Sequence, residues 1–357
     1  MWITSSLTTA MTPTAIALGN FDGVHLGHQA VIRQVLPAMA ADGLGASSPP
    51  PDRPLQGFSH RCQDRGNRLM SIARPSQTSA TPVPTVMTFS PHPQEFFSGR
   101  SRPLLTPLTE KAAQISRLGI GQLVLMPFNQ ELADLSPEAF VDILLVKQLQ
   151  VRRISVGRDF CFGKRRQGTV DDLKTLAARH GVEVCIAPIT CLGRDRISSS
   201  RIRQALDACD LSTVEALLGR PYSLTGRVVK GQQLGRRLGF PTANLSVPVD
   251  KYLPRHGVYS VWVQGSAQTP YTLVPGVMNI GNRPTVEGLS TTVEVHLLNW
   301  SGDLYGKTLQ VYVHHALRPE QKFSSLDELK AQIQHDCRTA LAVLAKPPVG
   351  NWPTIRA

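Results

Sequence analysis

Residues 17–28 have the sequence ALGNFDGVHLGH, and this stretch decides how the first half of the chain folds. The apolar run from Ala15 to Leu18 predicts a buried strand, and from Leu26 apolar residues follow at helical spacing. Glycine, asparagine and aspartate between them predict a tight turn. The first turn of a helix presents unpaired N–H groups and a partial positive charge, so this junction suits a phosphate group.

Two histidines, His25 and His28, lie at the predicted start of this helix. Both can donate hydrogen bonds to phosphate oxygens without the strong hydration of a lysine. An ordinary glycine turn with two surface histidines would also account for the pair. Because glycine turn, histidine pair and strand–helix order occur together, nucleotide binding is the favoured interpretation.

The composition predicts a two-domain globular protein. The chain has 357 residues, 41% hydrophobic and 18% charged, with a net charge of +12. That charge fits nucleic acid or small polyanions such as ATP and flavin phosphates. The six cysteines form no CxxC pair and no secretory signal precedes them, so we expect a reduced, cytoplasmic protein. No apolar run nears the ~20 residues of a membrane span, and Met1 and Met11 are both candidate start residues.

Strands and helices alternate over residues 14–206. Apolar runs predict strands at 84–89, 122–127, 153–156 and 182–187, with helical patterns between them. This alternation predicts an α/β domain with a doubly wound parallel sheet. Residues 42–84 lack periodicity and predict a largely disordered insertion. The arginines of that insertion leave a nucleic-acid-binding arm as the alternative.

Three further segments of this half carry polar residues at strand ends or helix starts. Prolines flank His92 after one strand, and a basic, glycine-rich loop at 157–168 follows another. Serines 198–200 precede a helix, and Arg203 lies one turn inside it, where a guanidinium can hold a phosphate by two bonds. Each segment also has a structural explanation. The prolines around His92 can form a stiff turn, the basic loop can be solvated charge, and the serines can be an ordinary N-cap.

The second half follows a different pattern. After a short helix and connector at 207–220, β-rich runs at 224–229, 257–263, 271–280, 291–298 and 308–316 predict a small antiparallel β-barrel. Residues 324–344 predict a C-terminal helix that buries the face carrying Leu326, Leu329, Ile333 and Cys337. Alternation on a strand predicts that Glu294 and His296 point away from Val293 and Val295.

These motifs resemble those of one enzyme family. The strings GNFDGVHLGH, TFSPHP, VGRDFCFGKRRQG and ISSSRIR resemble the nucleotidyltransferase (HxGH) module of bacterial bifunctional riboflavin kinase/FAD synthetases. The strings GFPTAN, GVMNIGNRPT, VEVH and LYG resemble the riboflavin kinase module of the same family. Ser200 stands where the family has threonine, and Asn299 where it commonly has aspartate.

The resemblance implies roles for residues at the matching positions. It implies catalytic roles for Glu294, His25, His28 and Arg203, and Mg²⁺ binding by Thr242 and Asn244. It implies ATP or phosphate binding by Gly19, Phe21, Asp22, Gly23, Gly27, Ser199, Ser200, Arg203, Gly231 and Gly239. It implies flavin binding by Phe89, Pro91, His92, Pro93, Asp159 and Phe160.

The implied protein is a bifunctional enzyme. Residues 1–206 would form the FMN adenylyltransferase (FAD synthetase) domain and 221–357 the riboflavin kinase domain, with ATP as co-substrate and FMN and FAD as products. We expect no nucleic-acid or membrane partner. The alternative is a nucleic-acid-binding or regulatory protein that keeps a nucleotidyltransferase-like fold. Intact chemical residues in both halves favour the enzyme.

Overall fold

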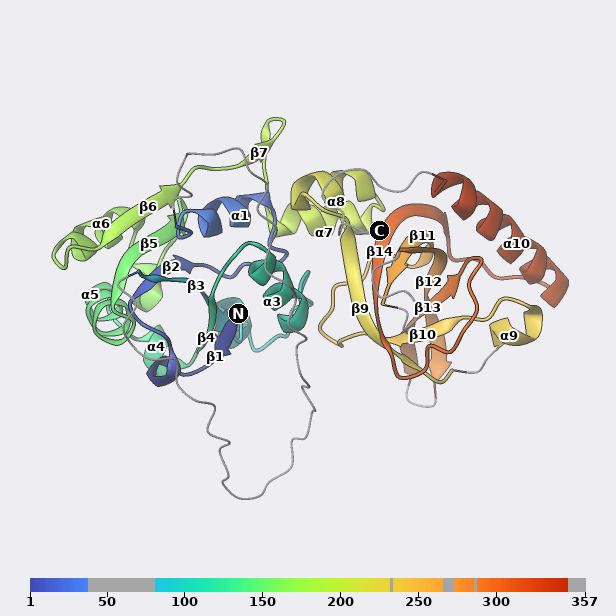
Figure 1. Cartoon of the computed structure of the whole chain (residues 1–357), viewed down its shortest axis with the longest axis horizontal. Helices are drawn as coiled ribbons and strands as arrows, with labels where there is room; N and C mark the ends of the chain where they lie inside the picture. The colour runs from blue at the N-terminus through green and yellow to red at the C-terminus, as the bar shows by residue number, and fades with distance from the viewer. Residues whose placement is uncertain (38–80, 232–233, 266–272, 286–287, 346–357) are drawn as a thin grey trace, which may run out of the picture.

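The computed structural model describes residues 1–37, 81–231, 234–265, 273–285 and 288–345. Two folds lie side by side, a helix-covered parallel sheet and a β-barrel, with helices α7 and α8 between them (Figure 1). Among these residues no helix is both long and apolar enough to cross a membrane. Most of the predicted insertion at 42–84 lies outside the described residues, and its last two residues begin strand β3.

The N-terminal fold is a six-stranded sheet in which every neighbouring pair is parallel. The spatial order β1-β4-β3-β2-β5-β6 confirms the predicted doubly wound arrangement. The strands are β1 (Trp2–Thr4), β2 (Thr14–Leu18), β3 (Val83–Ser90), β4 (Gln122–Pro127), β5 (Val151–Gly157) and β6 (Glu183–Ala187). The three-residue strand β1, which pairs with β4 at the sheet edge, was not predicted.

Helices cover both faces of this sheet, as alternating side chains require. Ile16 and Leu18 pack with the helical segment η2 on one face, and Ala15 and Ala17 pack with α1 and α3 on the other. The helical elements of this fold are η1 (Leu7–Thr9), α1 (Leu26–Arg33), α2 (Pro93–Ser98), α3 (Leu108–Arg117), α4 (Gln130–Ala133), α5 (Pro137–Ala139), η2 (Phe140–Gln148), η3 (Lys164–Arg166) and α6 (Val170–Ala178).

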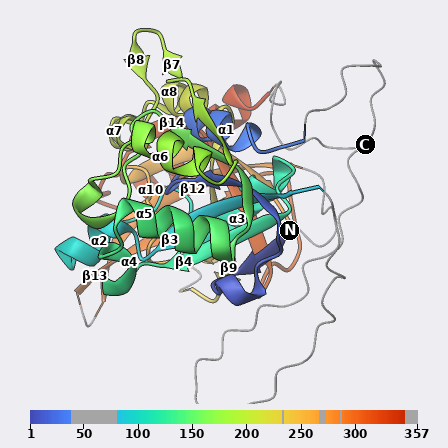
Figure 2. The ribbon, with the colours of Figure 1, turned by 90° about the vertical axis from the view of Figure 1, so that its left-hand side faces the viewer.

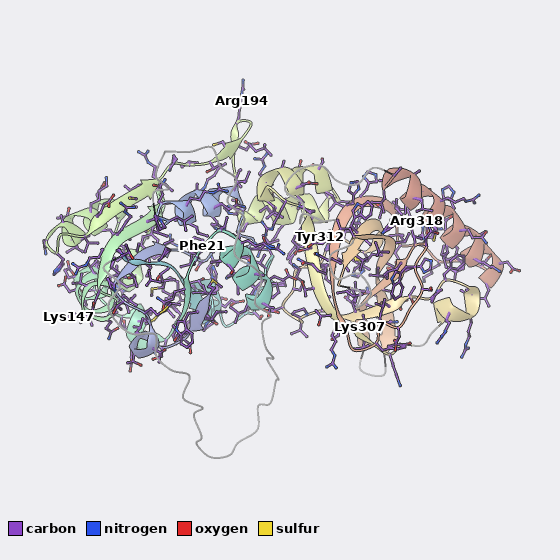
Figure 3. The ribbon with its side chains drawn as sticks, viewed as in Figure 1. Phe21, Lys147, Arg194, Lys307, Tyr312 and Arg318 are labelled. Atoms are coloured by element: carbon purple, nitrogen blue, oxygen red, sulfur yellow. The ribbon has the colours of Figure 1, made fainter. Side chains whose placement is uncertain are left out.

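A hairpin and two helices lead from the sheet to the barrel. Strands β7 (Cys191–Leu192) and β8 (Asp195–Arg196) form a hairpin that projects from the body (Figure 2). Arg194 lies at its tip (Figure 3). Helices α7 (Ser199–Asp207) and α8 (Leu211–Leu218) follow, and their apolar side chains join the same core as those of the barrel.

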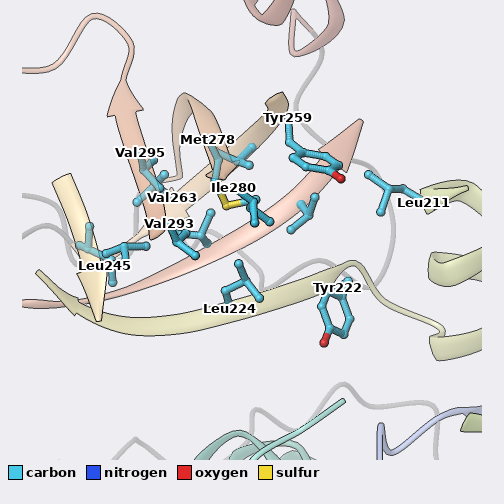
Figure 4. Packing of buried hydrophobic residues seen from close by; sticks show 14 of the residues in the cluster. Leu211, Tyr222, Leu224, Leu245, Tyr259, Val263, Met278, Ile280, Val293 and Val295 are labelled. Carbon is cyan, nitrogen blue, oxygen red and sulfur yellow. The ribbon is translucent and has the colours of Figure 1, made fainter. Parts of the chain in front are cut away.

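The C-terminal fold is a closed antiparallel barrel, which confirms the prediction. Inward-facing apolar side chains fill its interior (Figure 4). Its strands, in the spatial order β10-β13-β12-β11-β14-β9, are β9 (Tyr222–Val229), β10 (Ala243–Ser246), β11 (Gly257–Gln264), β12 (Val274–Thr285), β13 (Gly288–Leu297) and β14 (Thr308–Pro319). Strand β10 and the short helix α9 (Leu234–Leu238) were not predicted.

Helix α10 (Leu326–Val343) packs against the barrel through the predicted face, but that face is buried toward the end of the helix and exposed at its start. Leu326 is 60% exposed, whereas Asp336 and Ala340 are buried. Asp336 is buried because it accepts hydrogen bonds from the guanidinium of Arg318 on β14, at 2.9 and 3.1 Å. An ion pair therefore anchors the helix on the face that also carries the half-buried Ile333 and Cys337.

Sheet and barrel are joined by a buried ion pair. Lys251, in the barrel half, lies 2.5 Å from the carboxylate of Glu110 on α3, and both side chains are almost fully buried. The ammonium of Lys251 also donates to the carbonyl of Leu105, and the other carboxylate oxygen of Glu110 accepts the backbone N–H of Thr225. Every charge at this junction thus has a polar partner, which its burial requires.

We expect Lys251→Met to lower the free energy of unfolding by about 3–5 kcal/mol, because it leaves the buried Glu110 carboxylate unpaired. The double variant Lys251→Met/Glu110→Gln should recover most of this loss, since glutamine is neutral and still accepts the N–H of Thr225. Chemical denaturation of the three proteins measures both effects. A single variant as stable as the wild type would show that the pair does not hold the halves together.

Candidate active sites

A cavity of about 1170 Å³ lies at the carboxyl ends of β2, β3, β5 and β6. Strand order reverses beside β2, because the chain adds β3 and β4 on one side and then β5 on the other. Such a reversal is where open α/β sheets bind ligands. The predicted site residues that line the cavity are Gly19, Asp22, His25, Gly27, His28, Phe89, His92, Pro93, Asp159, Phe160, Ser199, Ser200 and Arg203.

Three predicted residues of this half are not among those lining the cavity, namely Phe21, Gly23 and Pro91. Phe21 is buried in the core and has a left-handed backbone, φ +49°. The N–H of Gly23 donates to the hydroxyl of Thr106 at 2.9 Å. Both residues therefore shape the turn, and neither reaches the cavity with a side chain.

The histidine pair is built into the start of α1. The Nδ1 atom of His25 accepts the backbone N–H of His28 at 3.2 Å and caps the helix. The two imidazole rings stack with centroids 3.6 Å apart. A side chain at Gly27 would meet the ring of His25 at 3.2 Å, so glycine allows this ring to lie against the helix.

Burial keeps both imidazoles neutral. Desolvation lowers the pKa of His25 to about 4, and the nearby charge of Asp22 opposes this only in part. Burial and the neighbouring His25 lower the pKa of His28 well below its ordinary value. Since Nδ1 of His25 accepts a hydrogen bond, its proton is assigned to Nε2. Nδ1 of His28 is buried and has no partner in the described part of the protein.

We expect the free energy of unfolding to decrease as the pH falls, and we expect His25 to cause part of this decrease because it takes up a proton more readily in the unfolded chain. Its pKa is lowered from 6.5 to about 4, so its contribution is complete above pH 6.5 and is lost as the pH falls toward 4. This shift of the pKa corresponds to a loss of about 3 kcal/mol in the free energy of unfolding. Denaturation at pH 7, 5.5 and 4 should therefore show a smaller loss for His25→Asn than for wild type. An equal decrease in the free energy of unfolding for His25→Asn and wild type would contradict this role for His25.

Asp22 and Arg203 form a buried ion pair at the edge of the cavity. Nη2 of Arg203 donates to the carboxylate of Asp22 at 2.5 Å and to the carbonyl of Pro103 at 3.0 Å. Nη1 donates to the carbonyl of Ser199 at 3.3 Å. The free two-pronged guanidinium predicted at this position is therefore absent, because both Nη2 hydrogens are engaged. Single donors remain at Nη1 and Nε.

The three serines before Arg203 have different contacts. Ser198 caps α7 by accepting the N–H of Arg201, and Ser199 donates to the carbonyl of Asp22 at 2.8 Å. Ser200 is exposed, lies in the first turn of α7 and lines the cavity. The N-cap explanation therefore holds for Ser198, while Ser200 and the first N–H groups of α7 border the cavity beside α1.

His92 caps the short helix α2, which begins at Pro93. Its Nδ1 accepts the N–H of Gln94, and the carboxylate of Glu95 accepts the N–H of His92 in return. This reciprocal cap places α2 at the cavity rim, where His92, Pro93 and Glu95 all line the cavity.

Of an aromatic cluster at this rim, the sequence analysis predicted only Phe89 as a site residue. Phe96 and Phe97 of α2 lie edge-to-face against Phe128, at centroid distances of 5.3 and 5.8 Å, and Phe128 contacts Phe89 in the same way. Phe97 is 69% exposed and lines the cavity with Phe89 and Phe128. Exposed aromatic rings at a cavity mouth can stack on a planar ligand ring. The two adjacent phenylalanines, Phe96 and Phe97, were the sequence feature from which this cluster could have been predicted.

Arginines gather at another part of the rim. Arg158, Arg165, Arg166 and Arg196 line the cavity. From the sequence, solvated charge was the default for Arg165 and Arg166, the resemblance of their glycine-rich loop implied contacts to nucleotide, and Arg196 was given no role. Arg196 and Asp159 form an exposed ion pair at 2.8 Å, which contributes little stability. A concave wall lined by arginines raises the local concentration of polyanions.

The second site lies on the outer surface of the barrel. Val293 and Val295 point into the barrel core, so Glu294 points outward, as predicted. Glu294 pairs in register with Asn244 on β10, and its carboxylate accepts the hydroxyl hydrogen of Thr242 at 3.3 Å. The structure therefore brings together the three residues that the sequence related only by resemblance.

The glycine-rich segment before β10 packs against this site. A Cβ at Gly231 would lie 2.3 Å from the side chain of Asn244, so a glycine is required there. Gly239 has φ +91°, a left-handed conformation that glycine adopts without strain. His296 lies 2.7 Å from the carbonyl of Pro241 through Nδ1, which fixes the segment beside Glu294.

The oxygen atoms of this site suit a hard cation that takes only a few of its ligands from the protein. Among the described residues, no group of three histidine, cysteine, aspartate or glutamate side chains could hold a metal ion. Thr242 and Asn244 offer neutral oxygens next to the carboxylate of Glu294. Mg²⁺ takes few protein oxygens and keeps water and phosphate oxygens as its other ligands, so the residues fit it.

Each half of the chain matches a known protein family, and the whole chain is similar to known proteins. The family model described as FAD synthetase matches residues 7–47 and 67–201, and the model described as riboflavin kinase matches residues 218–344. A protein named bifunctional riboflavin kinase/FMN adenylyltransferase from Escherichia coli K12 is 39% identical over 327 residues, 91% of each chain. Its namesake from Pseudomonas fluorescens is 38% identical over 329 residues, 92% of each chain.

A solved structure has the same overall fold. The crystal structure titled macrolide-efflux protein from Streptococcus pneumoniae superimposes with a TM-score of 0.75 at 26% sequence identity. The superposition covers 95% of this chain and 97% of that one, so it includes both the sheet and the barrel.

Proposed function

Because this chain belongs to the family of bifunctional riboflavin kinases/FMN adenylyltransferases, we propose that its two reactions take place at the two sites described above. The enzyme phosphorylates riboflavin to FMN with ATP. It then joins FMN to the AMP part of a second ATP, which gives FAD and pyrophosphate. The assignment of adenylyl transfer rests on the cavity at the strand reversal. Residues from four motifs that lie far apart in the sequence line this cavity.

We assign the cavity to adenylyl transfer and divide it into two ends. The phosphates of ATP lie against the first turns of α1 and α7, where His25, His28 and Ser200 line the wall. The flavin lies at the α2 side, where Phe89 and Phe97 offer aromatic faces. The cavity of about 1170 Å³ exceeds the roughly 300–1,000 Å³ of a site for one small molecule, as two substrates require.

The chemistry at this cavity needs no protein nucleophile. An oxygen of the FMN phosphate attacks the α-phosphorus of ATP, a new P–O–P bond forms, and pyrophosphate leaves. The neutral imidazole N–H of His25 and the N–H groups of α1 can donate to the oxygens on which negative charge increases. Arg203 acts mainly by fixing Asp22 in the turn, and a donor on Nη1 is left for the substrate. Catalysis is therefore positioning and charge stabilisation.

We assign riboflavin phosphorylation to the barrel site. Glu294 is the general base, which accepts the proton of the riboflavin 5′-hydroxyl as that oxygen attacks the γ-phosphorus of ATP, the bond from this phosphorus to the bridging oxygen breaks and ADP leaves. The hydroxyl of Thr242 donates to the same carboxylate and orients it. The backbone at Gly231 and Gly239 would contact the phosphate groups of ATP in this proposal.

The proposal includes Mg²⁺ as the metal of the kinase site. Thr242 and Asn244 would hold it through neutral oxygens, as the donor set allows. When bound, it would neutralise charge on the ATP phosphates. Removing divalent cations should stop FMN formation, and the loss should be reversed by adding Mg²⁺ back.

The remaining parts of the proposal concern boundaries and location. The adenylyltransferase domain spans about 1–206 and the kinase domain about 221–357, and α8 lies in the connector at 207–220. A cytoplasmic location is supported by five free cysteines in the described part of the chain, which is usual in reducing compartments. The proposal includes no nucleic-acid or membrane partner.

The direct test is to incubate the protein with riboflavin, ATP and Mg²⁺ and to separate the flavins by chromatography. We expect FMN to appear first and FAD to follow. Supplying FMN in place of riboflavin should give FAD without any kinase step. Absence of both products would overturn the enzyme assignment in favour of a binding or regulatory protein, and FMN alone would mean that the cavity is not an adenylyltransferase site.

A further inference from the structure

The turn that precedes the histidine pair is held through its backbone carbonyls. Lys111 donates to the carbonyl of Asn20 at 2.9 Å, and Ser199 donates to that of Asp22 at 2.8 Å. These two donors come from α3 and α7, elements of the N-terminal fold.

The next two carbonyls of the turn are held by Arg220. Its Nη2 donates to the carbonyl of Gly23 at 2.7 Å, and its Nη1 donates to that of Val24 at 3.1 Å. Arg220 lies between α8 and the first barrel strand, inside residues 218–344, the segment that matches the riboflavin kinase family model. The last residue of the connector, which lies within the segment that matches the kinase model, therefore contacts the nucleotide turn of the adenylyltransferase half.

This part of the turn has a backbone conformation that requires support. Gly23 has φ +90°, and Val24 has φ +43°. A β-branched side chain in the left-handed region is strained by about 1–3 kcal/mol, and it persists only where its surroundings fix it. Val24 immediately precedes His25, so its backbone sets the direction in which the first imidazole leaves the turn.

Gln29 connects α1 to the same group of atoms. Its side-chain amide donates to the carbonyls of both Val24, at 3.2 Å, and Leu218, at 3.1 Å. Arg220 also donates to the carbonyl of Leu218, at 3.4 Å. The end of α8 is pressed against α1 here, because a Cβ on Gly219 would overlap the side chain of Leu26 at 2.6 Å. The two donors and the two shared carbonyls form one closed network.

We propose that Arg220 is a positioning residue for adenylyl transfer, which holds the strained Gly23–Val24 turn and thereby orients His25 toward the reacting phosphate. The proposal rests on the assignment of adenylyl transfer to the cavity. It makes that reaction depend on a residue of the kinase-side segment that touches neither substrate. It also gives Gln29 a supporting part in the same role.

The test is Arg220→Ala, assayed for both reactions in the same preparation. We expect kcat for FAD synthesis from supplied FMN to fall about 30- to 100-fold, because a small misplacement of a catalytic group costs about this much. The KM values for ATP and FMN should change less than threefold. Riboflavin phosphorylation should stay within twofold of wild type, which shows that the barrel is intact. Added guanidinium should restore part of the lost activity.

Two further variants keep the test decisive if Arg220→Ala does not fold. Arg220→Lys keeps the charge but replaces the fork of Nη1 and Nη2 with one donor atom that lacks this fixed geometry, so we expect about a tenfold loss of kcat. Arg227→Ala is the control, because it removes an arginine–carbonyl bond on β9, to Gly306 at 3.1 Å, and should leave FAD synthesis unchanged.

Three outcomes would overturn the positioning role. They are normal FAD synthesis in both Arg220 variants, an equal fall of both activities, and a loss that lies wholly in KM. Wild-type protein that makes no FAD would instead refute the assignment of the cavity, independently of Arg220.

Discussion

Glu294→Ala should lower the rate of riboflavin phosphorylation by about 10³-fold, the size expected when a general base is removed. FAD synthesis from supplied FMN should remain within twofold of wild type, because Glu294 lies on the barrel and the adenylyl site lies at the sheet. Both rates can be read from one chromatogram of flavins. The intact second reaction then serves as an internal measure of correct folding.

Two variants sharpen this result. Glu294→Gln keeps the size of the side chain and can still accept the hydrogen bond of Thr242, yet it cannot take up a proton, so it should be as inactive as alanine. Thr292→Ala changes the neighbouring outward position of the same strand and should keep full kinase activity. If Glu294→Ala lost both reactions with its fold intact, the assignment of two separate sites would be wrong.

His25→Ala should reduce FAD synthesis from FMN by about 10²- to 10³-fold, as expected for the loss of one donor to a developing charge. Riboflavin phosphorylation should be unchanged. Alanine also removes the cap of α1, since Nδ1 of His25 accepts the N–H of His28, and this should cost about 1 kcal/mol of stability.

His25→Asn separates the two effects. Asparagine is a good N-cap residue, so thermal stability at pH 7 should recover relative to alanine. Its shorter side chain cannot place a donor where the imidazole Nε2 lies, so FAD synthesis should stay low. Recovery of activity together with stability would mean that His25 serves only as a cap.

The sequence predicted the elements that carry strong local patterns. Apolar runs marked the sheet strands from β2 to β6, and the structure confirms these strands. Strands β1 and β10 were missed because three or four residues carry no periodicity. The burial of Asp336 on α10 was not predicted, because this carboxylate is stabilised by Arg318, a partner that periodicity does not reveal.

The same limit applies to the cavity. Turn chemistry located His25 and the serines before α7 because their spacing has a local physical meaning. The pairing of Asp22 with Arg203 joins residues 181 positions apart, so only the folded chain reveals that this arginine is already engaged. Arg220 lies 196 positions from the carbonyl of Val24 and carries no motif of its own for nucleotide handling.

The continuity of the cavity has a consequence for inhibitor design. If its two ends hold a flavin and a nucleotide, a compound that links the two kinds of ring loses its translational and rotational freedom once, whereas two separate ligands lose it twice. Such a bisubstrate compound should bind more tightly than either half. The product FAD is itself a molecule of this kind, so its dissociation is expected to be slow and to compete with each new round of substrate binding.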